Sequence, residues 1–326
     1  MIDPIPTELD SRQIVFQPLY VPFASAIGVA FVLALFIWNY PSPNDPIGQK
    51  FVNVPEFWIW VFELGVMSAF LTVVFGPLWK QFVNLLKEQI SNRDTTRKLG
   101  IGVMLLLGIA IYLALGSSIY WVVPSNPIRL VVLPQGHHQR VMIIYGYALL
   151  TMLPLIASTL LVYKSILDKT RQIQPAGQDR AKLFGMAADL LRYRRLLQNY
   201  LLIAGIVVSI VPVATASLRS ILIAIGNVTE KDYPINIVMI YGLFFTAILI
   251  LFYVPTHLLL TDSSRKLRDR LCPIDSLPTL EESLQKRKAL DDWLETNIGL
   301  TQNLKAGIIA LAPLVSSFVA SVLGIQ

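Results

Sequence analysis

Two charged residues inside otherwise apolar stretches are the first candidates for a functional site in this sequence. Arg219 lies in the apolar stretch of residues 198–227, and Glu63 lies in another one nearer the N-terminus. A charge at such a depth costs about 2.5–3.5 kcal/mol unless it meets a partner, water or the interface. Arg219 therefore lines a pore that favours anions or binds an anionic substrate, or it lies at the outer interface, with residues 220–225 bent onto the membrane after Pro212. Glu63 pairs with Arg219, faces a water-filled cavity or lies at the interface.

A second group of candidate residues is basic and adjoins two apolar stretches. Its members are Arg192, Tyr193, Arg194 and Arg195 before one stretch, and Arg265, Lys266, Arg268 and Arg270 after the next. In one interpretation these residues set the membrane topology and contact anionic lipid headgroups. In the other they form an electropositive cytoplasmic vestibule that binds the phosphates of a nucleotide or a single-stranded nucleic acid. Tyr193 then stacks on a base, or else it lies at the membrane interface.

The sequence lacks the patterns that would indicate an enzyme or a metal site. It contains no Walker A loop, no G-x-S-x-G and no H-E-x-x-H motif. The single cysteine, Cys272, excludes an internal disulfide framework and a thiolate metal cluster. His137 and His138 are adjacent and point in different directions on regular structure, so ordinary use in a polar loop is favoured over metal binding. We expect no catalytic residue, no cofactor and no metal.

The composition predicts that these residues lie in a membrane. The 326 residues are 54% hydrophobic and only 15% charged, whereas soluble domains are about 25% charged. Apolar stretches of about 20 residues are long enough to cross a bilayer as helices. The sequence therefore predicts an all-α polytopic membrane protein with six transmembrane helices, at residues 19–40, 55–78, 99–123, 141–163, 201–225 and 235–260.

The distribution of Lys and Arg predicts the orientation. Of the 27 such residues, 22 lie in the N-terminal segment, in the loops after the second and fourth spans, and after the sixth. The opposite loops contain Lys50, Arg129, Arg140 and Lys231. The positive-inside rule places the more basic side in the cytoplasm. The N-terminus, which lacks the pattern of a cleavable signal, is then cytoplasmic, and the protein is a multi-pass protein of the bacterial inner membrane.

The chain then divides into six parts. They are a cytoplasmic N-terminus at 1–18, a four-helix transmembrane part at 19–163, a basic cytoplasmic loop and helix at 164–197, spans five and six at 198–260, a cytoplasmic amphipathic helix at 261–302 and an apolar C-terminal helix at 303–326. We expect residues 181–199 to form a helix that runs into span five.

The two parts after the sixth span carry further patterns. Thr279 and Glu282 fit a capping box, and a narrow apolar stripe with Leu284 and Leu294 follows it at helical spacing, with Trp293 beside it. Such a stripe suits packing against one neighbour, including the same helix of another subunit. The C-terminal helix, rich in Ala, Ser and Gly, is predicted to pack against protein. It is either a seventh span, a re-entrant or buried element, or a helix inside a cytoplasmic assembly.

The six spans, the large basic cytoplasmic loops and the terminal sequence NLKAGIIALAPLVSSFVASVLG give the chain a resemblance to a known group. It resembles the small membrane effectors of bacterial anti-phage defence, of the Hailong channel type. The resemblance covers most of the chain, its motifs are nonspecific, and no functional residue can be carried across. It implies an oligomeric channel whose opening is controlled by a nucleotide-type signal bound on the cytoplasmic side.

These patterns together predict a homo-oligomeric ion channel. It conducts anions if Arg219 lines the pore, and a nucleotide or oligonucleotide gates it from the cytoplasm. Its partners are membrane lipids and further copies of the chain. One alternative is a scaffold or subunit without a pore, which recruits a partner through its cytoplasmic helices. Another is a transporter with an anion site at Arg219.

Overall fold

The computed structural model describes residues 19–38, 40–41, 44–90, 133–173, 180–226, 228–273, 280–294 and 300–322. Within these ranges the chain is helical. Its helices are α1 (Tyr20–Ile37), α2 (Pro46–Asn53), α3 (Pro55–Ile90), α5 (His137–Gln172), α6 (Arg180–Ala224), α7 (Asn236–Leu271), α8 (Leu280–Trp293) and α9 (Leu300–Val322).

Five of these helices, α1, α3, α5, α6 and α7, are long and apolar enough to cross a membrane. The prediction of a helical membrane protein is therefore confirmed at this level. The predicted third span, at 99–123, lies outside the described residues, as do the N-terminal segment 1–18 and Thr279 of the predicted capping box.

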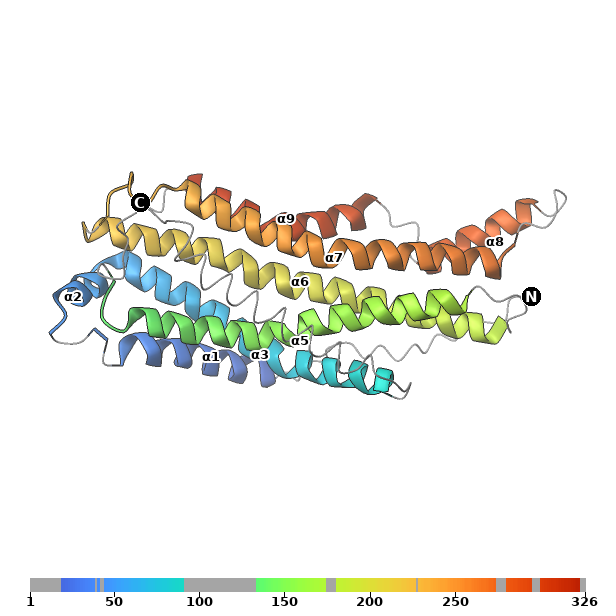
Figure 1. The fold of residues 1–326 in the computed structure, drawn as a ribbon, viewed down its shortest axis with the longest axis horizontal. Helices are drawn as coiled ribbons and strands as arrows, with labels where there is room; N and C mark the ends of the chain where they lie inside the picture. The colour runs from blue at the N-terminus through green and yellow to red at the C-terminus, as the bar shows by residue number, and fades with distance from the viewer. Residues whose placement is uncertain are drawn as a thin grey trace.

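The long helices α3, α5, α6 and α7 run along the long axis of the molecule and pack against one another (Figure 1). They contain 36, 36, 45 and 36 residues. At 1.5 Å per residue such helices are about 54–68 Å long, whereas the hydrocarbon core of a bilayer is about 30 Å thick. Each helix is thus long enough to extend beyond a bilayer, and α6 joins the predicted helix at 181–199 to the fifth predicted span without a break.

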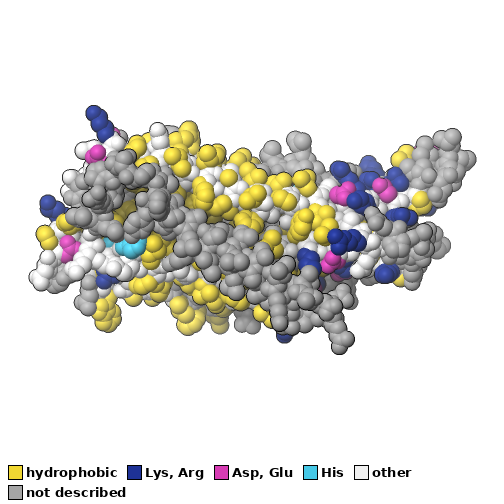
Figure 2. All heavy atoms as spheres, in the orientation of Figure 1, with side chains coloured by type: hydrophobic (Ala, Val, Ile, Leu, Met, Phe, Trp, Pro, Cys, Tyr) yellow, Lys and Arg dark blue, Asp and Glu magenta, His cyan; other side chains and the backbone are white. Residues whose placement is uncertain are grey.

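The two ends of the bundle differ in charge. Lys and Arg side chains, with Asp and Glu among them, gather at the end where α8 lies, and hydrophobic side chains cover much of the visible middle (Figure 2). We call the end with α8 the basic end. The opposite end, where α2 and the link from α6 to α7 lie, is called the outer end (Figure 1).

Pro212 does not bend α6 away from the bundle. A proline inside a helix removes one backbone donor, which membrane helices tolerate because neighbouring groups satisfy the freed carbonyl. Here α6 continues past Pro212 to Ala224, and the amide of Ile225 still donates to the carbonyl of Ile221 at 3.0 Å. The expectation that residues 220–225 lie bent on the membrane surface is therefore wrong.

An aromatic core closes the outer end around His137, the first residue of α5. Its side chain is 1% exposed, its Nδ1 atom forms a 2.9 Å hydrogen bond with the Tyr40 hydroxyl, and its ring stacks on Trp60 with 5.3 Å between centroids. Asp45 caps α2 and also accepts from the amide of Gln135 at 2.7 Å, which joins two outer segments. The interpretation of His137 as an ordinary polar-loop residue is wrong, because it is a core residue.

The C-terminal helix α9 packs along α6 and α7 (Figure 1). A Cβ atom at Gly242 of α7 would lie 2.2 Å from Oγ of Ser317 and 2.7 Å from the carbonyl of Pro313. A Cβ atom at Gly205 of α6 would lie 2.6 Å from Cγ2 of Ile309. Two glycines therefore let α9 approach closely, as small residues do between membrane helices. The helix packs against protein within its own subunit.

Helix α8 docks at the basic end through the C-terminal part of its apolar stripe. Leu294, directly after α8, is 1% exposed, and Leu290 and Trp293 pack beside it against a cluster from α5, α6 and α7. Leu284 is 50% exposed, so the start of the stripe is not covered within this subunit.

Candidate functional site

Arg219 is held near the outer end by a turn that reverses the chain after α6. Gly226 has a φ of 71°, a left-handed conformation that glycine adopts without strain, and its amide donates to the carbonyl of Ile223. The chain then returns over the end of α6, and the carbonyl of Tyr233 accepts a 2.6 Å hydrogen bond from Nε of Arg219. Only 8% of Arg219 is exposed. Arg219 is therefore largely covered by the chain near the outer end.

No carboxylate compensates the charge of Arg219 within the part of the chain that the structure describes. None of the described ion pairs includes Arg219. Its hydrogen bond to the carbonyl of Tyr233 uses one of the five N–H donors of the guanidinium group. A buried arginine in this state is a candidate anion site, because a planar guanidinium binds anions through several N–H groups at once.

The segment that bonds Arg219 carries Tyr233, which has two further tyrosines as electrostatic neighbours. Tyr233, in the link before α7, interacts electrostatically with Arg219, with Tyr241 of α7 and with Tyr145 of α5. Burial raises the pKa of the Tyr233 hydroxyl, so it stays protonated and able to donate a hydrogen bond at neutral pH. The outer end thus combines one guanidinium group with phenol groups from α5, α7 and the link before α7.

Glu63 lies on the other side of α6. Its Oε1 atom accepts a 2.9 Å hydrogen bond from Oγ of Ser217. Ser217 and Arg219 are two residues apart and therefore point about 200° apart around the helix. The predicted ion pair between Glu63 and Arg219 is not formed, because α6 separates them. The Oε2 atom of Glu63 is buried, with no hydrogen-bond partner among the described residues.

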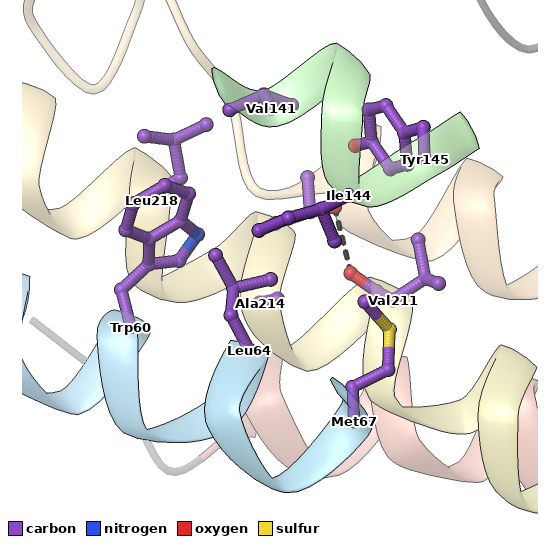
Figure 3. Close-up of a pocket in the computed structure, with 10 residues that line it drawn as sticks. Trp60, Leu64, Met67, Val141, Ile144, Tyr145, Val211, Ala214 and Leu218 are labelled. Carbon is purple, nitrogen blue, oxygen red and sulfur yellow. Dashed lines mark hydrogen bonds between the residues drawn. The ribbon is translucent and has the colours of Figure 1, made fainter. Parts of the chain in front are cut away.

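A cavity of about 40 Å³ lies between α3, α5 and α6 (Figure 3). Thr215 and Leu218 of α6 line it, and they precede Arg219 by four residues and one residue. Tyr145 of α5 also lines it, opposite Trp60 of α3. Tyr145 therefore lines this cavity and is also an electrostatic neighbour of Tyr233, whereas Arg219 itself does not line the cavity.

At the basic end, the first predicted patch is partly buried. Arg192 forms two hydrogen bonds with Glu88 of α3, at 2.7 and 3.2 Å. Tyr193 is 5% exposed and Arg194 is 2% exposed, and Nη1 of Arg194 donates to the carbonyl of Leu294. Tyr193 is therefore not placed to stack on a base or to lie at an interface, and Arg194 is not on the surface. Arg195 is exposed.

The second predicted patch is largely matched by acids. Lys266 forms an exposed ion pair with Asp262 at 2.6 Å. Arg268 bonds both oxygens of Asp291 in α8, at 2.9 and 3.0 Å, and also contacts Asp269. Arg265 and Arg270 have exposed side chains.

Helix α8 is held in place by these and related contacts. Besides the Arg268–Asp291 pair, Nε of Arg287 donates to the carbonyl of Cys272 at 2.7 Å, and Arg194 reaches the carbonyl of Leu294. Three arginines thus join α8, or the residue directly after it, to α6 and to the end of α7. The sequence pattern assigned Arg194 and Arg268 to a ligand-binding patch and carried no sign of this structural role.

Sequence reasoning also gave no role to Tyr145, Tyr233 and Tyr241, which are electrostatic neighbours of one another. Tyrosines near the ends of apolar stretches usually mark the membrane interface, so their residue type carries no signal for an anion site. No family model, curated protein or solved structure was found to match this sequence. Roles for these residues therefore follow from their geometry and chemistry.

Proposed function

We propose that this protein is a homo-oligomeric membrane channel that conducts anions. The observation that carries the proposal is Arg219, which is 8% exposed near the outer end of a membrane-length helix. It has no carboxylate partner among the described residues, and its bonded acceptor is a neutral carbonyl. Positive charge near a pore favours anions and opposes cations.

The proposed location is the bacterial inner membrane, with the basic end in the cytoplasm. The positive-inside rule supports this orientation, because most Lys and Arg residues belong to segments at that end. We propose six spans, one of which is formed by residues 99–123. Helix α9 is proposed as a seventh. Its 23 residues give a length of about 35 Å, enough to cross the hydrocarbon core.

The proposed gating signal is a nucleotide or a short single-stranded nucleic acid at the basic end, as the resemblance to Hailong-type effectors implies. The exposed Arg195 and Arg265 support phosphate binding there. Arg192, Lys266 and Arg268 already bond carboxylates, so a ligand would have to compete with Glu88, Asp262 and Asp291 for them. A ligand that displaces Asp291 would also loosen α8.

The test is a reversal-potential measurement on the full-length protein in planar bilayers with a chloride gradient. We expect wild type to be anion-selective, Arg219→Gln to lose selectivity, and Arg219→Glu to shift the reversal potential toward cations. Lys231→Glu is the matched control, because Lys231 is an exposed cation of the same outer segment, and we expect a smaller shift from it.

Two outcomes contradict the proposal. Unchanged selectivity in a conducting Arg219→Glu protein removes Arg219 from the conduction path. The second outcome is that wild type shows no conductance at high protein density, either with or without candidate nucleotides. This result rejects the channel and favours the scaffold that recruits a partner through α8.

A further inference from the structure

Asp291 of α8 holds its carboxylate against an arginine of the second basic patch. Nη1 of Arg268 in α7 donates to both oxygens of Asp291, at 2.9 and 3.0 Å. We infer that α8 is a strap in which Asp291 takes the place of a phosphate group, and that a soluble polyphosphate ligand binds Arg268, displaces Asp291 and releases α8. This inference rests on the proposed ligand at the basic end and deepens it, since it names the subsite and the element that the ligand moves.

The donors of Arg268 set up this competition. Asp269 accepts from Nε and Nη2 of Arg268, at 3.0 and 2.9 Å, so Nη1 is the nitrogen that Asp291 occupies. A guanidinium group binds carboxylates and phosphates through the same planar set of N–H groups. A ligand with several phosphate groups also carries more negative charge than one carboxylate. Nη1 therefore serves Asp291 or a phosphate group, but not both at once.

The end of α7 suits a polyphosphate once Asp291 has left. Residues 262–270 contain four cations and two acids. Arg265 is exposed and lies three residues before Arg268, so both arginines lie on the same face of α7. Two neighbouring arginines can bind two phosphate groups of one ligand, whereas Asp291 offers a single carboxylate.

The position of the pair favours a soluble ligand. The side chains of Arg268 and Asp291 are 22% and 10% exposed, so a ligand reaches the pair from its edge. Arg268 lies eight residues past Leu260, where the sixth predicted span ends. Eight residues correspond to about 12 Å along a helix, which places Arg268 beyond the ordinary depth of a lipid headgroup contact at the end of that span.

Release of α8 would weaken the joint between α6 and α7 at the basic end. Arg194 of α6 donates to the carbonyl of Leu294, and Arg287 of α8 donates to the carbonyl of Cys272, directly after α7. Leu294 is also 1% exposed in a cluster from α5, α6 and α7. Helix α9 contacts α6 and α7 as well, but through close packing at glycines, which an anion does not replace. The strap is therefore the link that a phosphate ligand can open.

The test is hydrogen exchange of the full-length protein in detergent, followed by mass spectrometry as tripolyphosphate is added. Sodium chloride at the same ionic strength is the reference, because it screens charge without offering a phosphate group. We expect the amides of α8 to exchange roughly tenfold faster or more at saturating tripolyphosphate, the factor that corresponds to the loss of one charge-assisted contact. The amides of α9 should exchange as before.

Titration calorimetry with tripolyphosphate tests the competition itself. Asp291→Asn keeps the shape of the side chain and removes the competing charge, so it should lower the Kd by roughly fivefold or more. Asp292→Asn is the matched control, because it removes the same charge from the next residue of α8, which is exposed. It should change the Kd by less than about twofold. Asp291→Glu retains a carboxylate and covers the case in which Asp291→Asn does not fold, and it should bind tripolyphosphate with a Kd near that of wild type.

The outcomes separate this inference from the proposed function, because neither measurement needs ion flux. Faster exchange of α8 with tripolyphosphate and not with sodium chloride supports the strap, even if bilayers show no conductance. Binding of tripolyphosphate with unchanged exchange of α8 overturns the strap and leaves the proposed ligand site standing.

Three further results would also overturn the strap. An equal rise in exchange with sodium chloride would mean that screening alone loosens α8. Equal effects of Asp291→Asn and Asp292→Asn on the Kd would mean that overall charge and not competition governs binding. Release of α8 by phosphatidylglycerol added to the micelles, without release by tripolyphosphate, would identify a lipid headgroup as the occupant.

Discussion

Ser217 donates a 2.9 Å hydrogen bond to Oε1 of Glu63, while Arg219, two residues further along α6, donates to the carbonyl of Tyr233 at 2.6 Å. Glu63 of α3 thus bonds one face of α6, whereas Arg219 projects from the opposite face of α6. Neither neutralises the other, so each needs a separate explanation. For Arg219 we have proposed a role in anion conduction, and for Glu63 the structure gives a bond between α3 and α6.

We predict that Ser217→Ala lowers the free energy of unfolding by about 1 kcal/mol, the usual size of one interhelical hydrogen bond in a membrane protein. The measurement is unfolding in mixed micelles. In a Glu63→Met background the same substitution should have little effect, because the acceptor is gone. Ser209→Ala is the control, since Ser209 bonds the carbonyl of Gly205 in its own helix. Equal losses in both backgrounds would show that the bond does not stabilise the fold.

The contact between Arg268 and Asp291 predicts a strong effect at the basic end. Asp291 has a side chain only 10% exposed. Its removal leaves Arg268 with Asp269 as its remaining partner, which we expect to cost about 1–3 kcal/mol. Asp291→Ala should therefore increase hydrogen exchange across α8. Asp262→Ala breaks a pair whose members are 49% and 55% exposed and should cost less than about 1 kcal/mol. The prediction fails if both variants leave the exchange of α8 unchanged.

The docking of α9 predicts opposite effects for two glycine substitutions. Gly242→Ala places a Cβ atom 2.2 Å from Oγ of Ser317 and 2.7 Å from the carbonyl of Pro313, a clash that costs about 1–3 kcal/mol. Gly146→Ala meets nothing within 4 Å and should stabilise α5 by about 0.5–1 kcal/mol. Thermal unfolding in detergent measures both. Destabilisation of the same size at both sites would exclude the close packing of α9 as the cause.

The proposed orientation predicts the labelling pattern of single cysteines. In a Cys272→Ser background, a membrane-impermeant maleimide added outside should label Lys50→Cys and Lys231→Cys. It should label Lys182→Cys and Arg265→Cys only after permeabilisation. All four positions are exposed, so accessibility within the protein does not decide the result. Labelling of position 182 from outside would reverse the scheme.

The proposed ligand at the basic end predicts salt-sensitive binding. A labelled oligonucleotide or cyclic nucleotide should bind in a polarisation titration at low salt, and affinity should fall steeply as salt rises. Arg195→Glu with Arg265→Glu should reduce binding, because both side chains are exposed there. Lys50→Glu, at the outer end, should not. Equal binding by the double variant and wild type would leave these arginines as topology signals and lipid contacts.

The class of this protein follows from its sequence alone. Low charge and long apolar stretches indicate membrane helices regardless of how the helices pack, because each stretch must satisfy its own backbone hydrogen bonds in lipid. The same apolar surroundings mark Glu63 and Arg219 as costly charges without any knowledge of their partners. Helix α9 was also predictable, as was its packing against protein from its small residues.

Tertiary packing sets which of the charged residues act together. The sequence grouped Arg192, Arg194 and Arg268 by their sign, yet one bonds Glu88, one is buried against Leu294 and one bonds Asp291. Likewise, Tyr145 of α5 is far from Tyr233 in the sequence, and only the packing of α5 with α6 and α7 makes the two tyrosines electrostatic neighbours. Helix formation depends on neighbours a few residues away, so a sequence pattern predicts it. Partner choice depends on the rotation of each helix and on long-range contacts, which the pattern within one stretch does not contain.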